Sequence, residues 1–128
     1  MRKIVVSVQN GLLAESITRM LEESREFSIY RSAIGSRNSL AVDCAMYGAE
    51  IVLMEVSPGR GLSLQARMEE TRQIKSANPD CKIVLLCDEN TSPDLAREVA
   101  LAKKDGRVDA FFYSSVTGSY LVAALAAL

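Results

Sequence analysis

The chain has 128 residues, enough for one domain with a sizeable core, and a hydrophobic content of 48% excludes a disordered chain. Fifteen basic residues nearly balance sixteen acidic ones, so no basic excess favours nucleic acid binding, and the absence of histidine excludes Ser-His and Cys-His catalysis. No apolar run approaches the roughly 20 residues of a membrane span, and we expect a cytoplasmic protein.

The first half of the chain predicts three strands and two helices. Residues 3–8 form a short apolar strand, and hydrophobic residues at helical spacing predict a helix after the Asn10-Gly11 turn. Residues 27–33 alternate weakly, which is typical of an edge strand. A short helix then runs from Leu40 to a glycine C-cap at Gly48. Residues 51–56 are apolar without alternation, which predicts a strand buried on both faces.

The second half repeats this alternation. Residues 63–77 predict a polar, amphipathic helix, and residues 82–87 predict a fourth strand. Ser92-Pro93-Asp94 is a strong helix start, because it combines a serine N-cap, a proline in the first turn and an acid near the helix N-terminus. Residues 110–113 predict a fifth strand. One face of a last helix carries Tyr120, Leu121, Ala124, Leu125 and Leu128.

Alternation of strands and helices predicts the architecture of the chain. Right-handed crossovers between successive strands require a parallel sheet with helices on both of its faces. We expect residues 1–128 to form one domain, since no linker or repeat interrupts them. The last helix ends without a cap, which indicates a domain cut from a longer protein or a face that meets a partner.

The third predicted strand ends on an acid. Glu55 closes this apolar run, and Pro58 and Gly59 follow in a loop. Open α/β sheets place their ligand crevice outside the carboxyl ends of the strands. Glu55 therefore marks the predicted site.

This order of elements, with an acid ending the third strand, resembles the receiver domain of two-component response regulators. The resemblance covers essentially the whole chain and implies a CheY-like, flavodoxin-like α/β fold. Such a fold is a three-layer sandwich around a five-stranded parallel sheet of order 2-1-3-4-5. It also implies a phosphate-accepting aspartate at the end of the third strand, where this chain has Glu55.

The other positions that carry chemistry in receiver domains also differ in this chain. An acidic pair that holds Mg²⁺ in the family falls on Val8 and Gln9. The family threonine or serine after the fourth strand falls on Cys87, and the lysine after the fifth strand falls on Ser114. The aromatic residue that rotates as a switch falls on Phe111.

These replacements remove what phosphoryl transfer requires. The reaction needs a nucleophile, a divalent metal and a cation that neutralises the transferring group. We therefore expect a pseudo-receiver that is not an enzyme, holds neither metal nor cofactor, and signals without phosphorylation. Glu55 has two interpretations here: a fixed charge that imitates a phosphorylated aspartate in part, or an acid with a structural role only.

By the same resemblance, the fourth helix, fifth strand and fifth helix would form the surface for a protein partner or for self-association. Tyr113 and Tyr120 are its candidate interface residues, although ordinary packing between helix and sheet also explains them. A helix-turn-helix output domain beyond Leu128 would then control transcription. This domain itself would contact neither nucleic acid nor a membrane.

Two alternatives remain open. A small-ligand or redox sensor would use the crevice around Gln9, Glu55, Cys87 and Ser114, although the three cysteines are explained equally well as buried free thiols. A flavin-binding protein of similar fold is disfavoured, because no loop rich in serine and threonine follows the first strand.

Overall fold

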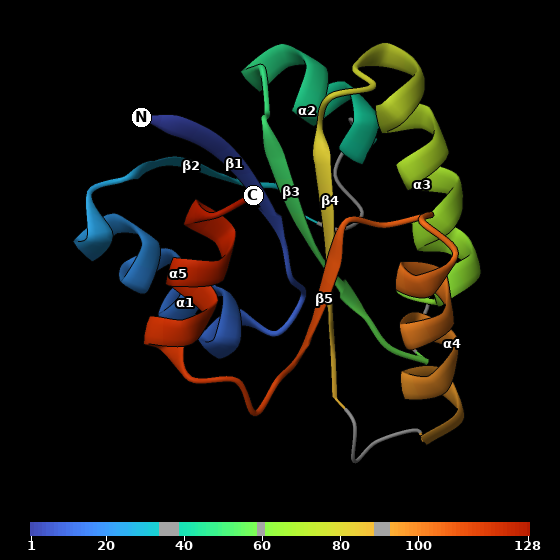
Figure 1. Cartoon of the computed structure of the whole chain (residues 1–128). Helices are drawn as coiled ribbons and strands as arrows, with labels where there is room; N and C mark the ends of the chain where they lie inside the picture. The colour runs from blue at the N-terminus through green and yellow to red at the C-terminus, as the bar shows by residue number, and fades with distance from the viewer. Residues whose placement is uncertain (34–38, 59–60, 89–92) are drawn as a thin grey trace.

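A computed structural model describes residues 1–33, 39–58, 61–88 and 93–128. Strands and helices alternate along these residues from the N-terminus to the C-terminus (Figure 1). The elements are β1 (Arg2–Ser7), α1 (Gly11–Ser24), β2 (Phe27–Arg31), α2 (Leu40–Tyr47), β3 (Ile51–Val56), α3 (Leu64–Ala77), β4 (Lys82–Cys87), α4 (Pro93–Lys104), β5 (Ala110–Tyr113) and α5 (Gly118–Ala126).

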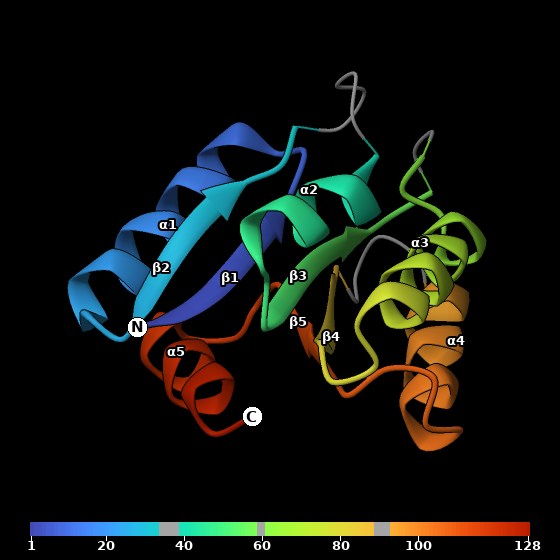
Figure 2. The same cartoon turned by 90° about the horizontal axis from the view of Figure 1, so that it is seen from above.

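The strands form one parallel sheet of order β2-β1-β3-β4-β5. Helices α1 and α5 cover one face of this sheet, and helices α2, α3 and α4 cover the other (Figures 1 and 2). This arrangement confirms the flavodoxin-like, CheY-like fold with strand order 2-1-3-4-5 that the sequence predicts. It brings the carboxyl ends of β1, β3 and β4 to the same edge of the sheet.

Each face of the sheet carries its own hydrophobic core. Residues Ile51 to Met54 of β3 are fully buried, as an apolar run without alternation predicts, because helices cover the strand from both sides. Odd and even positions of β3 then belong to different cores: Leu53 packs toward α1 and α5, whereas Met54 packs toward the other three helices. β2 lies at the edge of the sheet, as predicted.

Side-chain caps begin the helices close to the predicted positions. Asn10 does more than turn the chain, since its Oδ1 accepts a hydrogen bond from the Leu13 N–H at 3.1 Å and begins α1. Gly48 ends α2 with a positive φ of 75°, as the glycine C-cap predicts. The predicted N-cap at Ser92 and the predicted loop at 59–60 lie outside the described residues.

Two helices differ from the amphipathic patterns expected of them. The buried stripe of α3 consists of Arg67, Thr71 and Ile74, so polar side chains face the sheet where apolar ones are usual. In α5, Leu121 and Leu125 are buried but Tyr120 is 62% exposed, so Tyr120 does not share their face. No helix in the described part of the chain is long and apolar enough to cross a membrane.

Candidate functional site

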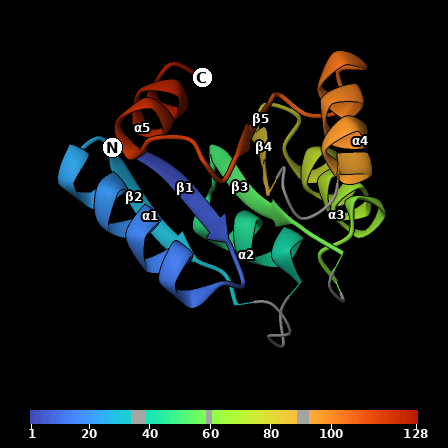
Figure 3. The same ribbon diagram turned by 90° about the horizontal axis from the view of Figure 1, so that it is seen from below.

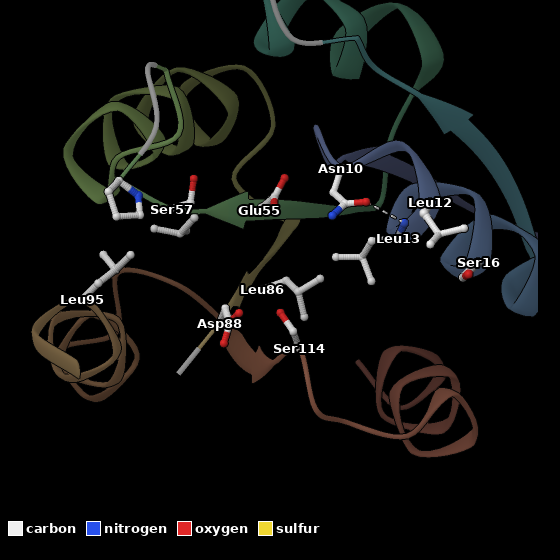
Figure 4. A pocket seen from close by; sticks show the side chains of 12 residues that line it. Asn10, Leu12, Leu13, Ser16, Glu55, Ser57, Leu86, Asp88, Leu95 and Ser114 are labelled. Carbon is white, nitrogen blue, oxygen red and sulfur yellow. Dashed lines mark hydrogen bonds between the residues drawn. The ribbon is translucent and has the colours of Figure 1, made fainter. Parts of the chain in front are cut away.

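Helices α1 and α4 lie on opposite faces of the sheet (Figure 3). A cavity of about 460 Å³ opens between them at the carboxyl edge of the sheet (Figure 4). Its polar lining includes two carboxylates, three hydroxyls and an amide, and its apolar lining comes mostly from leucines. The described residues that line it are Asn10, Leu12, Leu13, Ser16, Glu55, Val56, Ser57, Pro58, Leu86, Asp88, Leu95 and Ser114. The predicted site residue Glu55 therefore does lie in a cavity, as the position after a parallel strand suggests.

Glu55 lies at the end of β3 and contacts the chain that follows β1. The backbone N–H of Gln9 donates a hydrogen bond to Oε1 of Glu55, with 2.7 Å between the two atoms. The structure therefore brings the predicted acidic-pair position and the predicted phosphate-accepting position together. At the end of β1, Glu55 therefore meets a backbone N–H donor and not a second carboxylate.

Asp88 is a second acid in the cavity, and the sequence reasoning missed it. It directly follows the last residue of β4, and Glu55 is the penultimate residue of β3, so both acids lie at the carboxyl end of a strand (Figure 4). An acid after a buried parallel strand is the same signal that singled out Glu55, so it was available in the sequence. The cavity thus has a more acidic lining than Glu55 alone would give.

The predicted crevice around Gln9, Glu55, Cys87 and Ser114 is only partly assembled. Glu55 and Ser114 line the cavity together, but Cys87 is buried on the other side of the sheet, in the core beneath α2, α3 and α4. Side chains alternate across a strand, so Leu86 and Asp88 face the cavity while Cys87 faces away. Val8 and Gln9 border a separate cavity beside the ends of β1 and β2.

The aromatic positions at and after β5 differ in exposure. Phe111 is half-buried and meets the ring of Tyr113 edge-on, with 5.6 Å between the ring centroids. Both rings pack against the core that contains Cys87. Tyr120 contacts Phe112 edge-on at 6.3 Å but keeps most of its surface in solvent. Of the two predicted interface tyrosines, Tyr120 is therefore the more accessible.

A buried guanidinium lies beneath the site, and the sequence reasoning missed this too. Arg67 of α3 is 1% exposed, and its Nε donates to the backbone carbonyl of Glu55 at 2.8 Å. Its Nη2 donates to the carbonyl of Ser7 at 3.0 Å, and its Nη1 donates to Oγ of Ser7 at 3.1 Å. Nη1 also donates to Oε1 of Glu70 at 3.2 Å, which forms an ion pair. Arg67 thus joins the carboxyl ends of β1 and β3 from the α3 side.

Burial and nearby charges act in opposite directions on Arg67. Desolvation lowers the pKa of its guanidinium, and the carboxylates of Glu70 and Glu55 oppose that shift. A guanidinium offers donors in a rigid planar fork, which suits three acceptors on two neighbouring strand ends. Four of its five N–H groups are therefore engaged under the sheet edge, and Arg67 is not among the described residues that line the cavity.

The residues at this edge do not fit the magnesium ion that receiver domains hold. A cation needs oxygen ligands directed toward it, whereas the Gln9 N–H points its hydrogen at Glu55. Within the described ranges, no group of three or more Asp, Glu, Cys or His side chains is arranged to hold a metal ion. Among the described lining residues of the cavity, none is lysine or arginine.

Comparison with solved structures gives close agreement in fold at low sequence identity. A response regulator receiver domain protein from Clostridium thermocellum superposes with a TM-score of 0.74 at 20% identity, covering 98% of this chain and 91% of that one. The chain has the receiver-domain fold.

Two further structures with this fold illustrate its range. A two-component response regulator of the LuxR family from Aurantimonas sp. SI85-9A1 gives a TM-score of 0.73 at 15% identity, over 98% of this chain and 82% of that one. A CheY-like protein (tadZ) from Pseudomonas aeruginosa PAO1 gives 0.73 at 14% identity, over 98% and 97%. No family model matches the sequence, and no curated protein matches it closely enough to count as a relative.

Proposed function

We propose that this chain is a receiver-like signalling domain that works without phosphorylation and passes its signal through protein–protein contact. The observation that carries the proposal is the bond from the Gln9 N–H to Glu55. At the position where a receiver domain combines an aspartate with an acidic pair, this chain holds a glutamate that is already hydrogen-bonded to the backbone. Under this proposal the domain is not an enzyme, because it does not catalyse transfer of a phosphoryl group to its own side chain.

The surroundings of Glu55 support the same conclusion. Transfer of a phosphoryl group requires positive charge near the acceptor, and the lysine position of the family is Ser114 here. Asp88 adds negative charge to the same cavity, which repels an incoming phosphate. Arg67 is the buried cation among the described residues, and it donates to Ser7, Glu70 and the Glu55 carbonyl.

The proposal predicts the outcome of a direct chemical test. The chain is incubated with a small acyl phosphate and Mg²⁺, and its intact mass is then measured. We expect no adduct, while a receiver domain with a complete acidic site gains one phosphoryl group under the same conditions. A stoichiometric phosphate adduct on this chain would refute the proposal.

Within this proposal, Glu55 supplies a constant negative charge at the position where signalling receivers gain one. A glutamate carries about half the charge of a phosphorylated aspartate and has fewer acceptor oxygens, so the imitation is partial. Glu55→Gln separates this role from a structural one, because the amide oxygen can still accept the Gln9 hydrogen bond. If partner binding by the Gln variant equals that of the unchanged chain, the charge has no signalling role.

The face formed by α4, β5 and α5 is the first surface on which to look for a partner. Tyr120 is its large exposed aromatic residue, and exposed tyrosines commonly dominate binding energy at interfaces. A DNA-binding response regulator of the LuxR family from Staphylococcus aureus shares this fold, and by analogy we infer a transcriptional output through a separate DNA-binding segment. Under this proposal the domain acts in the cytoplasm and contacts neither DNA nor a membrane itself.

A second candidate function is a small-ligand sensor that uses the cavity beside Glu55. The volume of about 460 Å³ and the mixed polar and leucine lining favour it. Because Cys87 lies in the core, this version has no redox component at that residue. Thermal unfolding with nucleotides, acyl phosphates and oxidants would test it, and a rise in the unfolding temperature with one of them would favour a sensor over contact-based signalling.

A further inference from the structure

Helix α4 carries a stripe of solvent-exposed residues along one side. These residues follow each other at spacings of three and four, so they lie on one face of the helix. The hydrogen bond from the Asp105 N–H to the Leu101 carbonyl, at 2.8 Å, extends the helical path one residue beyond Lys104. We call this set the α4 stripe: Asp94, Arg97, Glu98, Leu101, Lys104 and Asp105.

Leu101 lies in the middle of the α4 stripe and is its single apolar member. It is 47% exposed, whereas Val99 and Ala102 of the same helix are buried in the core. On its α3 side lies a groove of about 350 Å³, bordered by Leu64, Gln65, Met68, Glu98, Leu101 and Arg107. We call this the α3–α4 groove, and the two helices that form it lie side by side in Figures 1 and 3.

The charges of the α4 stripe are complementary to those of a second, antiparallel copy of the same helix. Glu98 lies three residues before Leu101, and Lys104 lies three residues after it. Arg97 and Asp105 lie four residues before and after it, again with opposite signs. Two antiparallel copies of α4 that cross at Leu101 therefore place Glu98 against Lys104 and Arg97 against Asp105, on both sides of a two-fold axis.

We propose that the α4 stripe and the α3–α4 groove form the docking surface for a second copy of this chain. Leu101 of each copy enters the groove of the other, beside Leu64 and Met68, and four ion pairs surround this centre. The surface uses the α3 side of α4 and involves neither β5 nor α5, so it differs from the face considered above. It extends the proposed function and does not depend on whether the domain accepts phosphate.

The size and exposure of this surface determine how tight the dimer is. One helix face and one groove bury less than the roughly 1,600 Å² of a standard interface, so we expect a reversible dimer. Ion pairs at an exposed rim contribute mainly to orientation and specificity. Asp105 also pairs with Arg107 of its own chain at 3.8 Å, an exposed contact that Asp105 can exchange for Arg97 of a second copy.

Sedimentation equilibrium of the full chain, from about 10 μM to about 1 mM, measures this association. We expect a monomer–dimer equilibrium that Leu101→Glu weakens at least about tenfold, because it buries a charge at the centre of the interface. Met46→Glu is the matched control, since Met46 on α2 is also exposed, at 76%, and lies outside the α4 stripe. The control should leave the association constant unchanged.

A charge exchange tests the antiparallel geometry independently of Leu101. Glu98→Lys and Lys104→Glu should each weaken association about fivefold or more, because each places like charges opposite one another. The double variant restores both pairs and should return association to within about twofold of the unchanged chain. Glu23→Lys on the exposed side of α1 controls for the change in net charge.

Three results would overturn the proposal. The chain could stay monomeric at the highest concentration, or Leu101→Glu could leave the dimer intact, or the double charge exchange could fail to restore it. Loss of the dimer with Tyr120→Ser but not with Leu101→Glu would assign the contact to the α5 side instead. Circular dichroism shows whether each variant is folded, so loss of association is not confused with unfolding.

Discussion

Arg67 donates from Nη2 to the carbonyl of Ser7 across 3.0 Å, which ties α3 to the end of β1 in the buried interior. The same guanidinium donates to the carbonyl of Glu55 at 2.8 Å. The guanidinium of Arg67 therefore links the two strands whose ends carry the site. Arg67 thereby holds together the strand ends that carry Ser7 and Glu55, at an edge where the described residues do not fit a metal ion.

Removing the Arg67 side chain should destabilise the fold markedly. Arg67→Ala leaves two buried carbonyls and the Ser7 hydroxyl without their donor and also opens a cavity. We expect the free energy of unfolding to fall by about 3 kcal/mol. Arg67→Lys should recover less than half of that loss, because one ammonium group cannot reach all the acceptors. Urea denaturation followed by circular dichroism measures both.

Arg72 provides the matched control for Arg67. It lies on the same helix and pairs with Glu69, but both side chains are more than half exposed. Arg72→Ala should therefore leave the urea midpoint unchanged within error. Equal effects of Arg67→Ala and Arg72→Ala would contradict the interpretation of Arg67 as the link between β1 and β3.

The elements that the sequence predicts best are the strands of the buried sheet. The predicted bounds of β4 and β5 agree with the structure to the residue, because an apolar run is flanked by polar or turn-forming residues on both sides. The strand order follows from alternation and handedness, which are general properties of parallel sheets. These features depend on apolar runs and on the alternation of strands and helices, both of which are visible in a single sequence.

The site was harder to predict because it depends on tertiary contacts. Arg67 looks like a solvent-exposed residue of a polar helix until the acceptors at the ends of β1 and β3 are known. The resemblance places Cys87 in the crevice, but successive side chains of a strand point to opposite faces of the sheet, and the Cys87 side chain points away from the crevice into the core. Asp88 is one residue further on and faces the cavity.

Asp109 should make part of the stability of the fold sensitive to acid. Burial would raise the pKa of its carboxyl, but the Ile83 N–H at 2.7 Å and Lys75 at 3.1 Å lower the pKa below the ordinary 3.8. A depressed pKa in the folded state gives stability that is present above the unfolded pKa and is lost as the pH falls through the folded one. This contribution is therefore complete at neutral pH and disappears only below about pH 4.

Asp109→Asn isolates this contribution. At pH 7 we expect the free energy of unfolding to fall by about 1 to 2 kcal/mol, because hydrogen bonds to a charged acceptor are lost. The difference between the two proteins should shrink as the pH is lowered from 5 toward 2, which urea titrations at each pH would follow. Asp80→Asn, at an exposed turn, should shift neither curve. A difference that grows in acid would contradict the assignment.

The three cysteines should be unreactive in the folded protein. All are buried and none forms a disulfide, and burial raises the pKa of the Cys44 thiol to about 12 and that of Cys81 to about 11. Because the thiolate is the reactive form, an aromatic disulfide reagent at pH 8 should react at least about a hundredfold more slowly than with the unfolded chain. Rapid modification of a single thiol in the folded state would revive a redox role for that residue.

Restoring the chemistry of the site should require several substitutions together. Glu55→Asp alone supplies an acceptor carboxylate but leaves Gln9 without an acid for Mg²⁺ and Ser114 without a cation, so we expect no phosphate adduct with an acyl phosphate. The combination of Gln9→Asp, Glu55→Asp, Asp88→Thr and Ser114→Lys should accept one phosphoryl group; the threonine is placed at 88 because Asp88 lines the cavity, whereas Cys87 faces the core. Intact mass measurement distinguishes the two variants. Modification of the single variant would show that Glu55 alone prevents phosphorylation, and no modification of a folded fourfold variant would show that other residues also prevent it.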